Sequence, residues 1–445
     1  MVGSEASSAF WSSHNDILNA EDLYKNITVP VFGPGVAFDV PNKVFSEQKS
    51  IAKEGLTKAR FAKYTSLIEE ECINYLNDKW GDEGVLDLHV AMAEMIVFTA
   101  TRCLHGKETR EVFNAEEVAE IYSDLDGGFS PQAWLFPPWV PFPSFAKRDK
   151  AHVAIKDRFK QVVRKRAAAP AGTEYHDLLS TFMTCNYRRC NDNRKWNDDE
   201  ISGLLIALLM AGQHTSSTTS SWFGFFMCEN PGIQDALVAE QTKARGGLDQ
   251  EPKPLSLELL QEMPMLHACV RETLRLRPPI MQLMRKVRKS ITIKADGKEY
   301  VIPAGNQVCA SPSANGRNPN EWKEPNKFDP ARFLDDEGNC NDAHDYLGPE
   351  GERTEKKTNV HKWVPFGAGR HRCIGFEFAQ IQVRCVWATM LRMFELELPD
   401  GKMPTVNYRT MIHTPTDPQI KYRRRTPRGF AAPNPTKSGG HFTGS

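Results

Sequence analysis

The sequence predicts a mainly α-helical fold with a minor β component. Apolar residues recur at helical spacing over most of the 445 residues, one such stretch is much longer than an ordinary helix, and the strand-like runs are few and short. The 40% of hydrophobic residues can form a large core. We expect one domain over residues 1–425, followed by a tail at 426–445 whose Pro, Gly and Ser content predicts disorder.

The first half of the chain is expected to consist of helices around one apolar loop. Residues 44–120 have amphipathic spacing, which is clear from Val90 to Phe98, and the helical pattern resumes over 147–169. Between these segments, the prolines among residues 134–143 predict an apolar loop without helix.

The clearest helix is expected from residue 197 to residue 229. Asn197 can cap its first turn, and Glu200, three residues later, completes a capping box. The pair Asn230-Pro231 ends the helix. Its length of roughly 32 residues corresponds to about 48 Å. Such a helix can cross a whole domain.

The second half begins with another helix and then adds the strands. Residues 257–277 form a helical pattern that Pro278-Pro279 ends, and short strand signals follow at 290–293 and 300–302. Residues 335–360 are charged and rich in Gly, Asp and Asn, which predicts a solvated loop.

Composition excludes several classes of protein. Lys plus Arg equals Asp plus Glu at 56 each, which gives no support to nucleic-acid binding. The ten cysteines are scattered without a CxxC pair, which favours reduced thiols over a disulfide scaffold or a zinc cluster. Residues 1–26 lack a secretory signal, and the longest apolar run, 204–211, is too short to cross a bilayer. We therefore expect no membrane anchor in the chain as given.

Cys373 differs from the other cysteines in its surroundings. It lies in FGAGRHRCIG, residues 366–375, directly before a helical pattern. The partial positive charge of a helix N-terminus favours thiolate over thiol. The glycines Gly367 and Gly369 permit a tight turn, and Gly375 lets the chain lie flat against a planar ring. A buried structural cysteine is the alternative, but it leaves the glycines and the basic residues at 370–372 without a role.

This stretch resembles the cysteine loop of cytochromes P450, in the form FxxGxxxCxG. Glu272 and Arg275 resemble the ExxR pair of that family, since they lie one turn apart on a helix and can form a charge-assisted pair. Arg332 lies in a segment similar to the family's PxRF motif. The resemblance implies a structural Glu–Arg–Arg network beneath the loop, and a haem b iron bound by Cys373.

Two further signatures resemble one subfamily, the sterol 14α-demethylases. One is GQHTS at 212–216, and the other is the segment 24–39, which is similar to YxxLTxPVFGxGVxYD. The resemblance extends over residues 1–425. The subfamily usually has Tyr where this chain has Phe38, so one propionate contact should be absent, and Gln282 is polar where the substrate slot is generally apolar.

The resemblance assigns a role to each candidate residue. Tyr24, Lys49, Arg285 and His371 would hold the haem propionates, while Gly367 would shape the turn at the sulfur and Gly375 would lie against the ring. The substrate slot would be lined by apolar residues, each of which could equally be core: Ile27, Phe32, Phe129, Trp134, Ala211, Ile280, Met281 and Met411.

Oxygen activation is expected at the GQHTS segment. Gly212 in mid-helix costs about 1 kcal/mol against Ala, and the close approach of haem and dioxygen would offset that cost. Thr215 can hydrogen-bond a backbone carbonyl and open a groove in the helix. His214 can carry protons near neutral pH, and Asp126 is its expected partner, because a carboxylate would orient the ring.

The implied reaction is three oxygenations of a 14α-methyl sterol of the lanosterol or obtusifoliol type, with release of formate. The resemblance also implies O2 as co-substrate, electrons from NADPH through cytochrome P450 reductase, inhibition by azoles that ligate the iron, a monomer, and the endoplasmic reticulum membrane. Relative to the family, the membrane helix, the first helix and the first strands would be missing. Two alternatives stay open: a haem-thiolate monooxygenase of another lipid or a xenobiotic, and an inactive haem-binding fragment.

Overall fold

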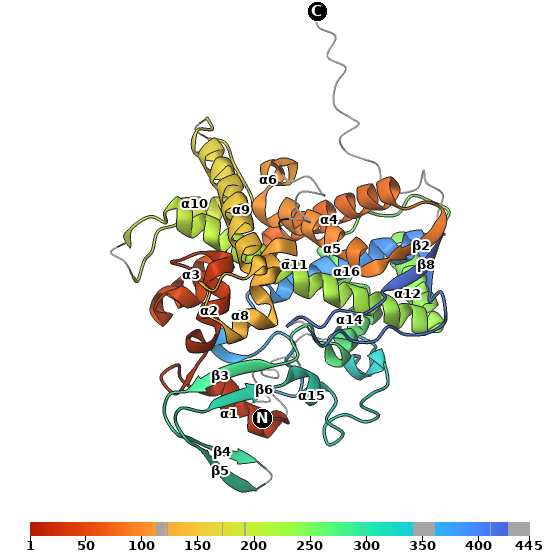
Figure 1. Ribbon diagram of the computed structural model, residues 1–445. Coiled ribbons are helices and arrows are strands. Elements are labelled where there is room, and N and C mark those ends of the chain that lie inside the picture. Colours follow the sequence, from red (N-terminus) through yellow and green to blue (C-terminus); the bar gives the residue numbers. More distant parts are fainter. Residues whose placement is uncertain are drawn as a thin grey trace, which may run out of the picture.

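The computed structural model describes residues 1–112, 121, 123–170, 172–190, 193–295, 297–340, 361–409 and 411–425. Within these ranges helices dominate and the sheets are small, which confirms the predicted mainly α fold with a minor β component (Figure 1). The helices are α1 (Ser4–Ser12), α2 (Glu21–Phe32), α3 (Asn42–Glu54), α4 (Lys58–Lys79), α5 (Leu88–Ala100), α6 (Lys107–Val112), α8 (Pro131–Leu135), α9 (Pro143–Ala167), α10 (Leu178–Thr184), α11 (Asp198–Glu229), α12 (Pro231–Arg245), α13 (Leu257–Gln261), α14 (Pro264–Leu276), α15 (Pro312–Gly316) and α16 (Phe376–Met393).

Helix α11 is the long helix that the sequence predicts. It has 32 residues, and the Asn197–Glu200 capping box is present with both of its hydrogen bonds. Helices α5, α9, α14 and α16 all pack against it, as Figure 1 shows for α5 and α16. Because these neighbours cover most of its surface, α11 forms the centre of the helical part of the molecule.

The sheets join segments that are far apart in the sequence. In one sheet β3 (Leu283–Val287) pairs with β1 (Leu18–Asn19) and with β6 (Gln307–Ala310), and in another β8 (Gln419–Arg424) pairs with β2 (Glu83–Asp87) and β7 (Phe394–Glu397). The third sheet is a hairpin of β4 (Ile291–Ala295) and β5 (Lys298–Ile302). Only these last two strands were predicted. Residues 4–19, for which no element was predicted, form α1 and β1.

Three predicted segments differ from the structure. The helical stretch at 44–120 is interrupted by β2, and its residues 113–120 lie outside the described ranges. The single helix expected at 257–277 is two helices, because α14 begins anew at Pro264. The proline-rich loop is shorter than 134–143: Trp134 lies in α8, and Pro143 begins α9, since proline is tolerated in the first turn of a helix.

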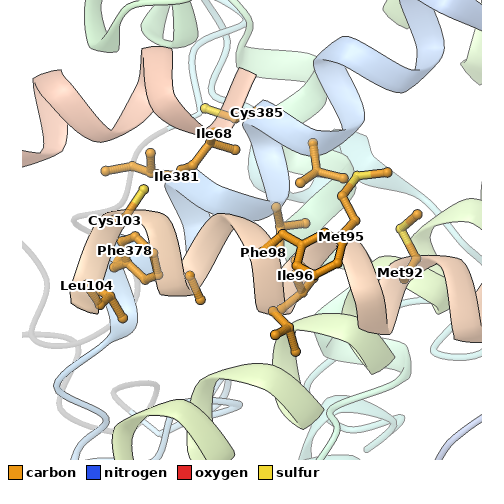
Figure 2. Packing of buried hydrophobic residues seen from close by; sticks show 14 of the residues in the cluster. Ile68, Met92, Met95, Ile96, Phe98, Cys103, Leu104, Phe378, Ile381 and Cys385 are labelled. Atoms are coloured by element: carbon orange, nitrogen blue, oxygen red, sulfur yellow. The ribbon is translucent and has the colours of Figure 1, made fainter. Parts of the chain in front are cut away.

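The hydrophobic core lies between α4, α5, α11 and α16. Figure 2 shows part of it, where Ile68 of α4 meets Ile381 and Cys385 of α16, beside Ile96 and Phe98 of α5. These side chains are at most 8% exposed. The loop that precedes α16 is therefore anchored, at the end where it joins α16, to the centre of the molecule. In the described part of the chain, no helix has both the length and the apolar character needed to cross a membrane.

Candidate active site

The Cys373 loop is held in shape by its glycines and its own backbone. It joins the short turn η8 (Gly369–His371) to α16, and the Cys373 N–H donates to the Phe366 carbonyl at 2.9 Å. Gly367 and Gly369 have φ of 66° and 62°, the left-handed region that favours glycine. A side chain at Gly369 would also collide with the Trp11 carbonyl oxygen of α1. The tight turn that the sequence predicts is therefore present.

Cys373 has surroundings that act on the pKa of its thiol in opposite directions. Its side chain is exposed, yet burial by the surrounding chain raises the pKa of its thiol. The Gly375 N–H and the cations of Lys49 and Arg372 lower this pKa but do not outweigh burial. The helix terminus therefore acts in the expected direction, through the Gly375 N–H, but desolvation is the larger effect. A metal cation bonded to the sulfur would favour the thiolate further.

Buried positive charge surrounds the neighbouring His371. Burial and the charges of Arg285, Lys49 and Arg370 lower the pKa of His371 to about 3. Lys49 Nζ donates to the Arg370 and Arg372 carbonyls at 2.8 and 3.0 Å, and burial lowers its pKa to about 8. These cations repel one another in a poorly solvated place, which an anion would relieve.

Two orphaned or weakly satisfied groups point to such an anion. His371 Nε2 is buried without a hydrogen-bond partner, and its ring stacks on Phe38 and Phe45. Arg285 is only 5% exposed and donates to the Met284 carbonyl at 2.7 Å, while the Tyr24 hydroxyl accepts the Met284 N–H at 3.0 Å. Phe38 brings a ring but no hydroxyl. A sulfur donor beside buried cations fits a group that carries both a metal and carboxylates, as haem does.

A buried ion network joins Glu272 to two arginines. Both Glu272 carboxylate oxygens accept from Arg275, at 2.7 and 2.8 Å, and Arg332 Nε lies 3.4 Å from the same carboxylate. Glu272 and Arg275 side chains are completely buried. The three residues that the sequence groups together are therefore in contact.

The middle of α11 has an accessible face within an otherwise buried helix. Ala211 is exposed, and a Cβ added to Gly212 would meet nothing within 4 Å. Thr215 Oγ1 donates to the Ala211 carbonyl at 2.8 Å, as expected. Helix α11 continues through these residues, so the expected groove stays a prediction that rests on the Thr215 bond. The open side of Gly212 leaves room for a bound group.

His214 and Asp126 are brought together as the sequence analysis expects. His214 Nε2 lies 2.9 Å from Asp126 Oδ1, although the contact lacks the alignment of a hydrogen bond. The side chains are 19% and 45% exposed, so Asp126 connects the pair to solvent. The roles of these residues stay predictions.

The candidate slot residues fall into separate groups. Ile27 is 1% exposed and packs with Ala133 and Phe145, so it presents no free face. The remaining candidates are half-buried or exposed. Phe32 packs against Phe129, with 6.1 Å between the ring centroids, and Trp134 packs against Tyr24. The others lie apart from these rings: Ile280 forms a β-bridge with Ile412, Met281 contacts His413, Met411 precedes Ile412, and Ala211 lies on α11. Gln282 is exposed.

Sequence reasoning missed the support that α1 gives to the site. The Phe10 ring lies under the Arg285 guanidinium at 4.8 Å, Trp11 contacts Gly367 and Gly369, and Arg370 donates to the Ser13 carbonyl at 2.8 Å. No local pattern in this segment signals the contact, because its partners lie hundreds of residues away.

Comparison with known proteins adds an independent observation. The family model described as Cytochrome P450 matches residues 8–422. The lanosterol 14-alpha demethylase of Bos taurus is 46% identical over 426 residues, which are 96% of this chain and 79% of that protein. The sterol 14-demethylase of Arabidopsis thaliana is 33% identical over 427 residues, covering 96% of this chain and 82% of its own length. Among solved structures, the retinoic acid bound cyanobacterial CYP120A1 matches with a TM-score of 0.79 at 20% identity, covering 96% of this chain and 88% of that one, which is a likeness of fold.

Proposed function

The chain belongs to the cytochrome P450 family, and we propose that it is a sterol 14α-demethylase, a monooxygenase that removes the 14α-methyl group of lanosterol- or obtusifoliol-type sterols. The observation that carries the proposal is the 46% identity to lanosterol 14-alpha demethylases over 96% of the chain. The obtusifoliol 14-alpha demethylase of Sorghum bicolor, 34% identical over 427 residues, supports the same reaction on a related sterol. The methyl group would become an alcohol and then an aldehyde, and would leave as formate.

Haem would be held by the Cys373 loop and by the cations that surround His371. Cys373 would bind the iron, while Tyr24, Arg285 and His371 would face the propionates and Lys49 would brace the loop carbonyls. When bound, the haem supplies dioxygen activation, which the thiolate promotes by donating electron density. Gly367 fixes the turn, and Gly375 offers its N–H to the sulfur.

Proton transfer would depend on two residues of α11 and on Asp126. Since the Thr215 hydroxyl donates to the Ala211 carbonyl, it can still accept a hydrogen bond from a group beside Gly212. His214 can hold a proton at Nε2 against the Asp126 carboxylate and exchange it through the exposed side of Asp126. These three residues would therefore carry protons from solvent to the reacting centre.

The sterol would be held mainly by burial of its apolar surface, at about 25 cal/mol per Å². We propose that the slot is lined by Phe32, Phe129, Trp134, Ala211, Ile280, Met281 and Met411. Ile27 would shape the slot only through its neighbours. By the same relatedness, electrons would come from NADPH through cytochrome P450 reductase, azoles would ligate the iron, and the protein would act as a monomer at the endoplasmic reticulum membrane. Residues 1–425 would form the one catalytic domain.

The proposal is tested by titrating the haem-loaded protein with lanosterol and obtusifoliol. We expect a low-spin to high-spin shift at micromolar sterol and, with reductase and NADPH, formate in equal amount to the demethylated sterol. A Cys373→Ala variant should lose the haem spectrum. Haem binding without a spin shift or formate from either sterol would show a different substrate.

A further inference from the structure

A buried glutamine of α3, Gln48, holds the backbone segment that leads into Phe38. Its side chain is only 1% exposed. Gln48 Nε2 donates to the Gly35 carbonyl at 3.0 Å, and Gln48 Oε1 accepts the Ala37 N–H at 3.2 Å. Helix α3 also packs against α10 and against the short turn η1 (Ala37–Asp39), and Figure 1 shows α3 beside α10. One amide side chain therefore fixes two backbone groups of this segment.

The Gln48 amide is itself oriented by a chain of hydrogen bonds from the start of α11. Gln48 Nε2 donates also to the hydroxyl of the completely buried Tyr187 at 3.0 Å, and this hydroxyl donates to Glu200 Oε1 at 3.1 Å. Glu200, a member of the α11 capping box, also accepts two hydrogen bonds from Arg194, both at 2.7 Å. A flipped amide would set its nitrogen against the Ala37 N–H, so these contacts fix its orientation.

The backbone that Gln48 holds is strained at Ala37. This residue has φ of 51°, in the left-handed region that favours glycine. A residue with a side chain stays in that region only where its surroundings impose the conformation. Here the bonds of Gln48 to Gly35 and Ala37 impose it. Because strain of this kind opposes folding, the contacts that maintain it point to a role for the position of the segment.

The next residue, Phe38, is the ring that this segment places beside His371. The Phe38 and His371 rings are stacked, with 6.4 Å between their centroids and an interplanar angle of 25°. Phe38 also stacks on Tyr24 at 5.5 Å, and Phe45 of α3 lies 5.6 Å away. A phenyl ring has no hydroxyl that could fix it by a hydrogen bond. The place of Phe38 therefore depends on ring packing and on the backbone that carries it.

We propose that Gln48 is a positioning residue, which holds Phe38 against His371 and Tyr24 and so keeps haem in its site. It acts through the backbone that it binds. Without its hydrogen bonds, Ala37 would relax out of the left-handed region and carry Phe38 away from the other two rings. Water would then reach the side on which His371 and Tyr24 would face the propionates, and haem would be held less tightly. The statement about haem rests on the proposed function.

A double-mutant cycle on the haem-loaded full chain tests this role. Gln48→Met removes the three hydrogen bonds with little change of volume, and Phe38→Ala removes the ring. The rate of haem transfer to an acceptor globin should rise about fivefold in Gln48→Met, the size of the contribution of one hydrogen bond. In the Phe38→Ala background the same substitution should change the rate less than about twofold, because the ring that Gln48 positions is gone. Independent effects of the two substitutions would overturn the proposal.

Gln234→Met is the matched control for a loss of stability. Gln234 is 2% exposed, and its amide binds the Leu396 N–H and carbonyl at 3.0 and 3.1 Å, where α12 meets β7. Urea unfolding should show a lower free energy of unfolding in both glutamine variants, but only Gln48→Met should lose haem faster. Faster haem loss in both variants would show a general effect of stability and refute the proposal. If Gln48→Met does not fold, Tyr187→Phe, which removes one bond of the chain, should show the same pattern at about twofold.

Sterol turnover is a separate outcome of these experiments. The expected coupling in the cycle, without a spin shift or formate from either sterol, would leave the role of Gln48 standing and the proposed substrate wrong. Independent effects on haem loss in a protein that demethylates the sterol would leave the proposed function standing and this role of Gln48 wrong.

Discussion

Two buried arginines in this protein, Arg275 and Arg285, differ in how many partners their guanidinium groups have. Every guanidinium nitrogen of Arg275 has a partner, either Glu272 or a backbone carbonyl, whereas Arg285 has the Met284 carbonyl and lies among other cations. The first arrangement is complete within the chain, and under the proposed function the haem propionates would complete the second. A buried charge that serves the fold is paired internally, and one directed at a ligand is left in excess.

The largest expected effect comes from breaking the paired arrangement. Glu272→Gln leaves the buried Arg275 and the half-buried Arg332 without this carboxylate, so we expect the free energy of unfolding to fall by about 3–5 kcal/mol, as for other broken buried pairs. Urea unfolding checks this. If the variant does not accumulate, Arg332→Gln is the milder test, because that contact is longer at 3.4 Å. A loss below about 1 kcal/mol, as for the exposed Arg288–Asp22 pair, would contradict the comparison.

A carboxylate at the other end of α14 gives the next largest effect. Glu240 of α12 accepts the Met265 and Leu266 N–H groups at 2.8 and 3.1 Å, and burial raises its pKa from 4.5 to about 7. The folded state therefore keeps the proton to higher pH than the unfolded state. The stability contributed by this proton is complete below about pH 4.5 and is lost as pH rises through about 7, by about 3 kcal/mol.

Urea unfolding of the wild type and Glu240→Gln at about pH 5 and pH 8 measures this contribution. The free energy of unfolding of the wild type, relative to that of the variant, should decrease from pH 5 to pH 8, because glutamine does not titrate. A difference that stays constant with pH would show that Glu240 is ionised throughout.

Local rules account for what the sequence could predict. The Asn197–Glu200 box fixes the start of α11, and two residues one turn apart on α14 form the Glu272–Arg275 pair. The His214–Asp126 contact was expected because a carboxylate would orient the imidazole ring, although nothing local links the two positions.

The remaining parts depend on long-range contacts that no local pattern announces. Strand β1 is only two residues long and exists through its pairing with β3. The support of Arg285 by Phe10 is equally remote in sequence. For Cys373, the helix terminus that lowers the pKa of the thiol is visible in the sequence, whereas the burial that raises it is not.

A smaller effect should follow from removing one unpaired cation. Arg285→Gln takes away a charge that the haem propionates would compensate under the proposed function, so haem should leave the protein about tenfold faster, the equivalent of about 1.4 kcal/mol. Transfer of haem to an acceptor globin measures the rate. Arg288→Gln, three residues further along, should leave the rate unchanged, because its charge is already paired with Asp22. Equal rates of haem loss in the two variants would show that the charge of Arg285 does not act on haem.

The smallest expected effect comes from two glycine substitutions in α11, whose effects on stability and on sterol affinity can be measured separately. Gly212→Ala adds a methyl group that meets nothing within 4 Å, so α11 should gain about 1 kcal/mol of helix stability. In Gly224→Ala the methyl would collide with Leu88 and Trp387 side chains, so that variant should lose stability. If the open side of Gly212 faces the sterol slot, the first variant should also bind sterol several-fold more weakly in the spin-shift titration. Gain of stability with unchanged sterol affinity would mean that this glycine faces a different space, and that the slot does not reach α11 at this turn.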